Sequence, residues 1–179
     1  MALDFKALEK TLRERFPESV LKWTVFRDQP CLHVKKDPVI EILRFLRDGP
    51  STRFAMLADL TAMDFLKYPL ELLEREDVPE RFAVVYQLTS LEHNARLRVK
   101  AYVPEEPCEI ATATGLWPAA NWAEREVYDL YGIRFTGHPD LRRILMPENY
   151  QGHPLRKDYP LKGRGERDHF PKYTEIPER

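Results

Sequence analysis

The fold is decided by the stretch from residue 82 to residue 103, FAVVYQLTSLEHNARLRVKAYV. Its first part, Phe82–Leu91, is rich in β-branched and aromatic residues and predicts a strand. Its second part, Ala95–Val103, alternates apolar and polar residues, and Glu92–Asn94 forms the turn between the two. One face of the second strand carries Leu97, Val99, Ala101 and Val103. The opposite face carries Arg96, Arg98, Lys100 and Tyr102. We therefore expect a β-hairpin with one face in the core and the other solvent-exposed or against another subunit.

The residues before this hairpin add two helices and three strands. Residues 4–16 predict a helix, because Asp4 suits the N-cap position and apolar residues then recur at helical spacing. Residues 20–26 and 31–35 predict two strands joined by a turn. A second helix runs from Asp37 to Gly49, residues 54–65 predict a strand, and residues 66–80 predict a loop.

This order of elements is helix, two strands, helix and three strands. It predicts an α+β fold, a two-layer domain with a mixed sheet, and argues against the alternating βα units of a Rossmann or TIM fold. A long helix over residues 118–131 follows, because Pro118 suits a first turn and Gly132 suits the position after a helix end. The apolar face of this helix is predicted to carry Ala119, Trp122, Ala123, Val127, Leu130 and Tyr131.

One carboxylate of this helix is out of place. Glu126 projects inside the predicted apolar arc, and Asp129 lies at its edge. A buried carboxylate needs a cation or several N–H donors. We therefore expect Glu126 to form a structural ion pair with one of the arginines that follow, Arg134, Arg142 or Arg143. A general acid or base is the alternative.

The composition changes after Thr136. Six of the fifteen prolines and four of the seven glycines fall within residues 137–179, and the apolar residues there follow no period. Such a segment buries too little against itself to offset its ordering entropy, yet its aromatic residues and arginines are typical of interfaces. We therefore expect a core domain over residues 1–136, which includes the 118–131 helix, and an extended partner-wrapping segment over residues 137–179.

Within this extended segment, we expect the part up to Met146 to be anchored to its own domain through Glu126, Asp129 and the arginines. The free strap is then predicted to begin at Pro147. An ordinary loop-rich C-terminus packed on its own domain is the alternative.

Composition also limits the function. The chain has 28 Lys and Arg against 29 Asp and Glu, and this net charge of −1 argues against general nucleic-acid binding. No apolar run approaches the ~20 residues that cross a bilayer, and no signal-peptide pattern opens the chain. Cys31 and Cys108 are too few for an iron–sulfur cluster, and no glycine-rich nucleotide loop is present. His138 and His153 each precede a proline without a third ligand nearby, so we expect turns rather than a metal site.

Two runs of sequence resemble a known family. They are residues 124–145, EREVYDLYGIRFTGHPDLRRIL, and residues 152–160, GHPLRKDYP. Together with the hairpin, they resemble the 30 kDa subunit family of respiratory complex I, the C-type subunit of bacterial NADH–quinone oxidoreductase. The signature residues in the first run are Glu124, Arg125, Glu126, Asp129, His138, Asp140, Arg142 and Arg143. The residues expected at a partner interface are Tyr150, His153, Leu155, Arg156, Lys157 and Tyr159.

The resemblance implies a non-catalytic scaffold subunit in the peripheral arm of proton-translocating NADH–quinone oxidoreductase. Members of the family bind no cofactor themselves, because FMN, the iron–sulfur clusters and quinone belong to partner subunits. The expected partners are the quinone-site subunit, called D-type or 49 kDa, and the B- and I-type cluster subunits. The expected location is the inner membrane, peripherally on the cytoplasmic side. The alternative is the equivalent subunit of a membrane-bound hydrogenase or of a photosynthetic NDH-type complex.

Two further classes of function are weaker. A free-standing hydrolase that uses Glu124, Glu126 or His138 lacks a nucleophile–base pair. A binder of nucleic acid or anionic lipid would use the basic residues near the C-terminus. Acidic residues are interleaved among them, which favours a mixed protein interface.

Overall fold

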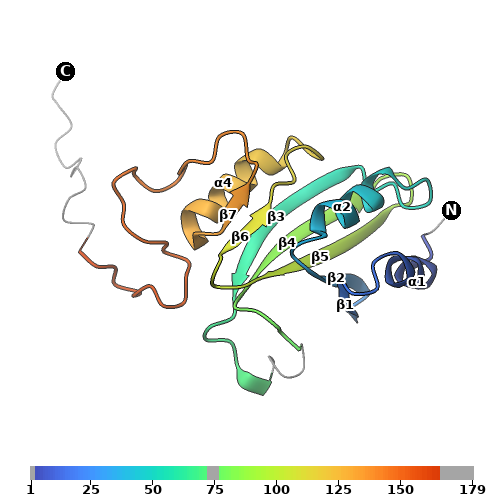
Figure 1. Cartoon of the computed structure of the whole chain (residues 1–179), viewed down its shortest axis with the longest axis horizontal. Helices are drawn as coiled ribbons and strands as arrows, with labels where there is room; N and C mark the ends of the chain where they lie inside the picture. Colours follow the sequence, from blue (N-terminus) through green and yellow to red (C-terminus); the bar gives the residue numbers. More distant parts are fainter. Residues whose placement is uncertain (1–2, 72–76, 166–179) are drawn as a thin grey trace.

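A five-stranded mixed sheet forms the centre of the molecule (Figure 1). The computed structural model describes residues 3–71 and 77–165. The strand order is β1-β2-β5-β4-β3, and only β2 and β5 are parallel neighbours. The strands are β1 (Val20–Phe26), β2 (Gln29–Lys35), β3 (Met56–Asp64), β4 (Phe82–Ser90) and β5 (Ala95–Val103). The predicted α+β fold with a mixed sheet is confirmed.

The predicted hairpin over residues 82–103 is formed by β4 and β5. Phe82 pairs with Val103 and Ser90 pairs with Ala95, with residues 91–94 as the turn. The four apolar residues predicted to face inward all belong to the core, namely Leu97, Val99, Ala101 and Val103. Because β5 also pairs with β2, this hairpin joins the N-terminal strands to the rest of the sheet.

The β1–β2 hairpin is tighter than predicted. Arg27 and Asp28 alone form the turn, with φ values of 49° and 61°, and β2 begins at Gln29. Positive φ at both central residues gives a turn whose twist matches that of the strands. Pro30 belongs to β2 rather than to the turn. Its missing N–H is tolerated because pairing between β2 and β5 begins one residue later, at Cys31.

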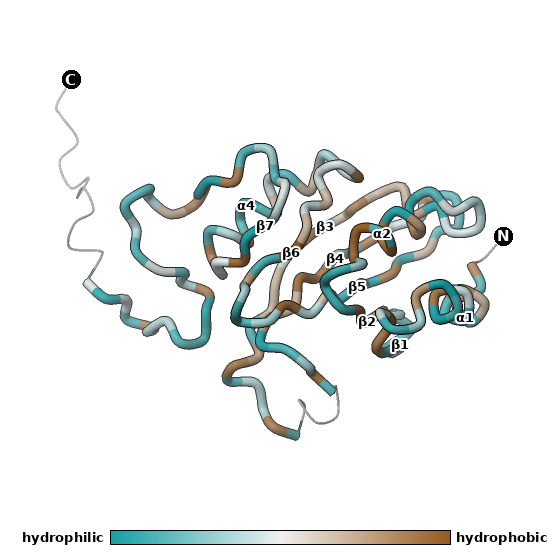
Figure 2. The backbone as a smooth tube through the Cα atoms, in the orientation of Figure 1, coloured by the Kyte–Doolittle hydropathy of each residue, from teal (hydrophilic) through white to brown (hydrophobic). Residues whose placement is uncertain are grey.

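Three of the helices in the described residues pack on the inward face of the sheet. They are α1 (Phe5–Arg15), α2 (Val39–Asp48) and α4 (Ala120–Tyr131). Asp4 caps α1 as predicted, since its carboxylate accepts hydrogen bonds from the N–H groups of Lys6 and Ala7. Buried residues of all three helices join one apolar cluster with the sheet. Figure 2 shows the hydrophobic colours gathered on the strands and on α2.

The outer face of the sheet is more covered than predicted. Arg96 is exposed, but Lys100 and Tyr102 on the same face are buried. Phe65 and Tyr68, which follow β3, pack over this part of the face, and the Phe65 and Tyr102 ring centroids lie 6.2 Å apart. The chain itself therefore closes one end of a face that was expected to meet solvent or another subunit.

A second, two-stranded sheet was not predicted. β6 (Glu109–Ala111) and β7 (Arg134–Thr136) pair in parallel beside α4, with Ile110 and Phe135 buried in the core (Figure 1). Strands of three residues are too short to produce an alternating pattern. This sheet brings the residues after β6 and after β7 to the flank of α4.

The described residues after β7 form what we call the C-terminal segment, residues 137–165. It contains no helix or strand and lies at the opposite end of the molecule from α1 (Figure 1). It is mostly hydrophilic, with isolated hydrophobic residues (Figure 2). The rest of the predicted partner-wrapping segment, residues 166–179, lies outside the described residues.

Candidate functional site

The helix α4 is buried on two sides, and this arrangement defines the candidate site. Ala120 and Val127 belong to the core cluster under the helix. Arg125 and Asp129, on another side, make hydrogen bonds with residues of the C-terminal segment. Gly132 ends the helix in the left-handed conformation, with a φ of 77°, as predicted.

The predicted role of Glu126 is wrong. Glu126 is exposed, and Trp122 is 66% exposed, whereas Glu124 and Asp129 are fully buried. A helical wheel predicts burial from the positions of apolar residues alone. Here neighbouring loops supply N–H donors to Glu124 and Asp129, and a cation to Asp129, so these polar residues are buried instead. The buried ion pair is made by Asp129 and Arg143, with Oδ1 and Nη1 2.7 Å apart.

Asp129 organises the first part of the C-terminal segment. Its Oδ2 accepts hydrogen bonds from three consecutive backbone N–H groups, those of Ile144 at 3.0 Å, Leu145 at 2.7 Å and Met146 at 2.9 Å. Burial raises the pKa of Asp129, but these donors and Arg143 outweigh it, so the pKa lies below its usual range. The ionised carboxylate therefore accepts the backbone N–H groups that a helix or strand would otherwise pair within the segment.

Asp64, at the end of β3, organises the second part of the segment. Its carboxylate accepts hydrogen bonds from the backbone N–H groups of Lys157 at 2.8 Å and Leu66 at 2.9 Å. The Arg81 side chain donates to both of its oxygens, at 3.2 and 3.1 Å. Burial raises the pKa of Asp64, but these donors outweigh it and hold the pKa below its usual range. A core strand thus holds the backbone of the segment 93 residues further on.

Arg81 and Arg156 extend this contact over the Phe82 ring. The guanidinium carbons lie 4.8 and 5.1 Å from the ring centroid. Arg81 also pairs with Asp158 at 3.0 Å, and both arginines pair with Glu105. One buried aromatic ring therefore makes cation–π contacts with two arginines from different parts of the chain.

His153 packs against the end of α4. Its Nδ1–H donates to the Asp129 backbone carbonyl at 2.9 Å, and burial lowers the pKa of the ring. A Cβ at Gly132 would lie 2.6 Å from His153 Cδ2, so the close approach requires glycine. The backbone of Leu155 adds a hydrogen bond to the Leu130 carbonyl at 3.0 Å. The segment is therefore anchored well beyond Met146, which corrects the predicted start of a free strap at Pro147.

Glu124 forms a separate buried site beneath α4. Its carboxylate accepts hydrogen bonds from the Thr112 hydroxyl at 2.5 Å and from the Ala113 N–H at 2.6 Å. Burial raises the pKa of Glu124 to about 7, although both hydrogen bonds lower it. Among the described residues the buried Tyr86 hydroxyl has no hydrogen-bond partner, and burial beside Glu124 raises its pKa.

His138 lies beside this carboxylate in a turn, as predicted for a His-Pro pair. Its Nδ1 accepts a hydrogen bond from the Asp140 N–H at 3.0 Å, so the ring proton lies on Nε2. Nε2 donates to the Asn121 carbonyl at 3.1 Å and lies 4.0 Å from Glu124. These contacts give His138 a structural position next to a buried acid.

Some of the residues predicted to act together do meet, and others do not. Asp129 and Arg143 form a pair, whereas Arg142 pairs with Asp140 at the surface, 3.0 Å away. Tyr150 and Tyr159, both predicted at an interface, share a hydrogen bond of 2.6 Å between their hydroxyls.

Three residues of the site, Asp64, Arg81 and Thr112, were not predicted from the sequence. A signal existed for the first two, because each is a charged residue at the end of an apolar strand. Thr112 follows the short strand β6, which itself leaves no pattern in the sequence.

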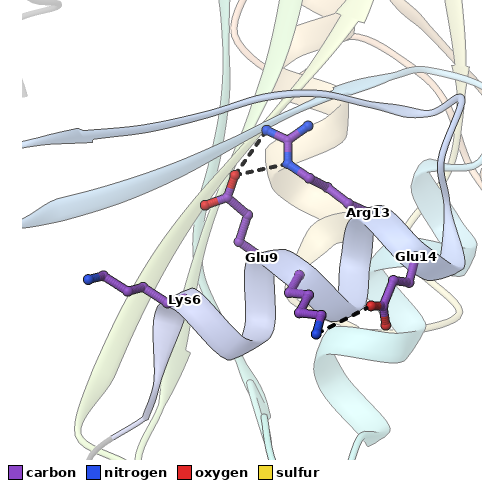
Figure 3. Close-up of a pocket in the computed structure, with 5 residues that line it drawn as sticks. Lys6, Glu9, Arg13 and Glu14 are labelled. Atoms are coloured by element: carbon purple, nitrogen blue, oxygen red, sulfur yellow. Dashed lines mark hydrogen bonds and ion pairs between the residues drawn. The ribbon is translucent and has the colours of Figure 1, made fainter.

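A hollow along α1 is lined by charged side chains (Figure 3). It has a volume of about 410 Å³ and is lined by residues of one helix face. Glu9 and Arg13 pair at 2.9 Å, and Lys10 and Glu14 pair at 3.9 Å, each four residues apart. These groups are partnered along their own helix, so the hollow is a solvated helix face.

Comparison with known proteins gives a match over most of the chain. The family model described as respiratory-chain NADH dehydrogenase, 30 kDa subunit, matches residues 32–165. This chain belongs to that family. The match extends from β2 to the end of the described C-terminal segment, so both carboxylate anchors lie inside it.

Curated relatives carry the name of the C-type subunit of NADH-quinone oxidoreductase. The chain is 49% identical over 154 residues to the relative from Geobacter metallireducens, and the aligned part covers 86% of this chain and 88% of the relative. It is 47% identical over 165 residues to the relative from Trichlorobacter lovleyi, with 92% and 94% covered.

Two solved structures are similar to this chain. One is the trypsin-resistant fragment (1–134) of Nqo5, with a TM-score of 0.62, 38% identity and coverage of 75% of this chain and 98% of that one. The other belongs to the membrane-bound sulfane sulfur reductase, an archaeal respiratory membrane complex, with a TM-score of 0.70 over 98% of both chains. At 20% identity, the second shows that the fold is shared.

Two features of this family member concern metals and membranes. Within residues 3–71 and 77–165, no three His, Cys, Asp or Glu side chains come together in a group that could hold a metal ion. In the same part of the chain, no helix has the length and apolarity to cross a bilayer.

Proposed function

We propose that this chain is a non-catalytic scaffold subunit in the peripheral arm of a proton-translocating NADH–quinone oxidoreductase. Membership of the 30 kDa family and the identity of about half to the C-type relatives support the complex. One structural observation supports the scaffold role. Buried Asp64 and Asp129 hold an otherwise irregular C-terminal segment in one conformation, which leaves Leu145, Leu155, Lys157 and Leu161 exposed.

The proposed partner of the C-terminal segment is the quinone-site subunit, called D-type or 49 kDa. The B- and I-type cluster subunits are proposed as further neighbours. In this proposal FMN, the iron–sulfur clusters and quinone lie in partner subunits, and the chain is peripheral to the inner membrane on its cytoplasmic side. The relatives' names support the complex, and the exposed leucines of the segment support a partner contact there.

Co-purification tests the proposal. A tagged full-length chain is expressed in cells that lack the untagged copy, and we expect it to recover the D-type subunit in equal amounts. Truncation after Met146 should abolish this recovery and leave a folded chain, because Asp129 keeps its three N–H donors. The trypsin-resistant 1–134 fragment of the related Nqo5 supports independent folding of such a domain.

Three outcomes would contradict the proposal. Incorporation of the truncated chain into a full complex would show that the segment does not hold it there. Recovery of a hydrogenase large subunit in place of the D-type subunit would favour the related membrane-bound complexes. Visible absorbance with stoichiometric iron in the isolated chain would overturn a role without cofactors.

A further inference from the structure

The C-terminal segment lines a groove on the surface of the molecule. It has a volume of about 850 Å³ and lies between the turn at residues 154–163 and the loop after β3. Its lining includes Lys67, Tyr150, Leu155, Lys157, Tyr159 and Leu161. Leu161 is as exposed as in an extended chain, at 103%, and Leu155 is 43% exposed. An isolated exposed leucine is ordinary, but two beside a hollow with two tyrosines form an apolar patch.

The walls of this groove are fixed by the core. The Lys157 N–H donates to Asp64, the Leu155 N–H donates to the Leu130 carbonyl, and the two tyrosine hydroxyls bond each other. The groove therefore has its shape before any partner arrives. A preformed site avoids much of the entropy cost of ordering a loop on binding.

The described residues that line the groove carry a net positive charge. Lys67 and Lys157 are both exposed, and neither side chain forms an ion pair with another described residue. The acid in the lining, Asp158, is already engaged by Arg81 at 3.0 Å and Arg156 at 3.6 Å. Residues 137–165 carry six Lys and Arg against three Asp and Glu, although the whole chain has a net charge of −1.

We propose that this groove binds a segment of the partner subunit in which a carboxylate stands beside an aliphatic or aromatic side chain. The carboxylate would lie between Lys67 and Lys157, and the apolar side chain against Leu155 and Leu161. This inference rests on the proposed role as an assembly subunit. The apolar lining, and the acid already built into it, favour a protein over a polyanion such as nucleic acid or anionic lipid.

Charge reversal tests the groove. The full-length double variant Lys67→Glu/Lys157→Glu is titrated onto membranes from cells that lack this chain. We expect its affinity to fall by about tenfold or more, and its binding to lose the salt dependence that the wild type shows between about 0.05 and 0.5 M salt. The matched control is Lys6→Glu/Lys35→Glu, which makes the same charge change at two exposed lysines outside the segment. We expect wild-type affinity from the control.

The outcomes separate the two proposals. Equal affinity of the Lys67→Glu/Lys157→Glu variant and the wild type would overturn the proposed binding role of the groove and leave the scaffold role intact. Failure of the wild type itself to bind the depleted membranes would overturn the scaffold role. Binding of the wild type to protein-free vesicles with acidic lipid, or to duplex DNA, at the affinity seen with membranes would overturn the choice of a protein partner. Leu161→Asp gives a second test, because it cannot disturb the fold from a fully exposed position and should also weaken binding.

Discussion

Two carboxylates of the same helix have pKa values that move in opposite directions. Asp129 receives three backbone N–H groups and the Arg143 guanidinium, and its pKa falls although burial raises it. Glu124 receives one hydroxyl and one N–H, and burial raises its pKa to about 7. Glu124 lies deeper in the molecule, and Asp129 has more donors, one of them cationic, so burial and donors together set the difference.

The first prediction concerns Asp129. Asp129→Asn removes the charge opposite Arg143 and one acceptor oxygen, and we expect it to lower the free energy of unfolding by roughly 2–4 kcal/mol in urea titrations. Glu126→Gln on the same helix is the control, and its exposed side chain should leave the midpoint unchanged. Equal stability of Asp129→Asn and the wild type would contradict the anchoring role.

The second prediction concerns Glu124 and pH. A carboxyl whose pKa is raised from 4.5 to about 7 by folding keeps its proton in the folded state after the unfolded chain has lost it. Its contribution is therefore fully present below pH 4.5 and is lost as pH rises towards 7. The loss amounts to roughly 2–3 kcal/mol.

Glu124→Gln should remove this pH dependence. We expect the difference in unfolding free energy between the variant and the wild type to grow in the variant's favour from pH 4.5 to pH 7, measured by urea unfolding at a series of pH values. Glu126→Gln again serves as the control and should follow the wild type. A constant difference between Glu124→Gln and the wild type across this range would show that Glu124 ionises normally.

At the scale of elements, the C-terminal segment is ordered without any helix or strand. Two carboxylates, one from α4 and one from β3, receive its backbone N–H groups at residues 144–146 and at Lys157. Its side chains then close over α4 and Phe82. The core therefore supplies the hydrogen bonds that regular secondary structure would otherwise supply within the segment itself.

The third prediction tests this dependence at Asp64. Asp64→Asn weakens the bonds to Arg81 and to the Lys157 N–H, so the residue 153–161 region should open more often. We expect limited trypsin digestion to cut after Arg156 and Lys157 at least several-fold faster, with the sheet still intact by circular dichroism. Asp59→Asn is the control, because Asp59 is an exposed carboxylate on the same strand. Unchanged cleavage rates would mean that Asp64 does not hold the segment.

At the scale of the whole molecule, the two ends have different surfaces. The α1 end carries charged residues that are paired along their own helix, as in Figure 3. The opposite end carries the C-terminal segment, with a net positive charge and exposed leucines. The truncation and charge-reversal experiments above address this second end, where we place the partner.

The sequence by itself determined the five strands of the main sheet, the helices α1, α2 and α4, and their order, because these depend on local periodicity. The β4–β5 hairpin, the helix α2 and the Asp4 cap follow from residue spacing alone. The family also follows from the sequence, since the run from Glu124 to Leu145 is long and specific.

Only the tertiary structure decided which carboxylate of α4 is buried and where the C-terminal segment is held. Hydropathy placed Glu126 inside, but Thr112 and residues 144–146, distant in sequence, bury Glu124 and Asp129 by supplying their donors. In the same way, Asp64 meets Arg81 because β3 ends beside the start of β4, and it meets Lys157 because the C-terminal segment folds back onto this end of the sheet. Burial of a charge depends on partners that folding brings together, and local pattern does not contain that information.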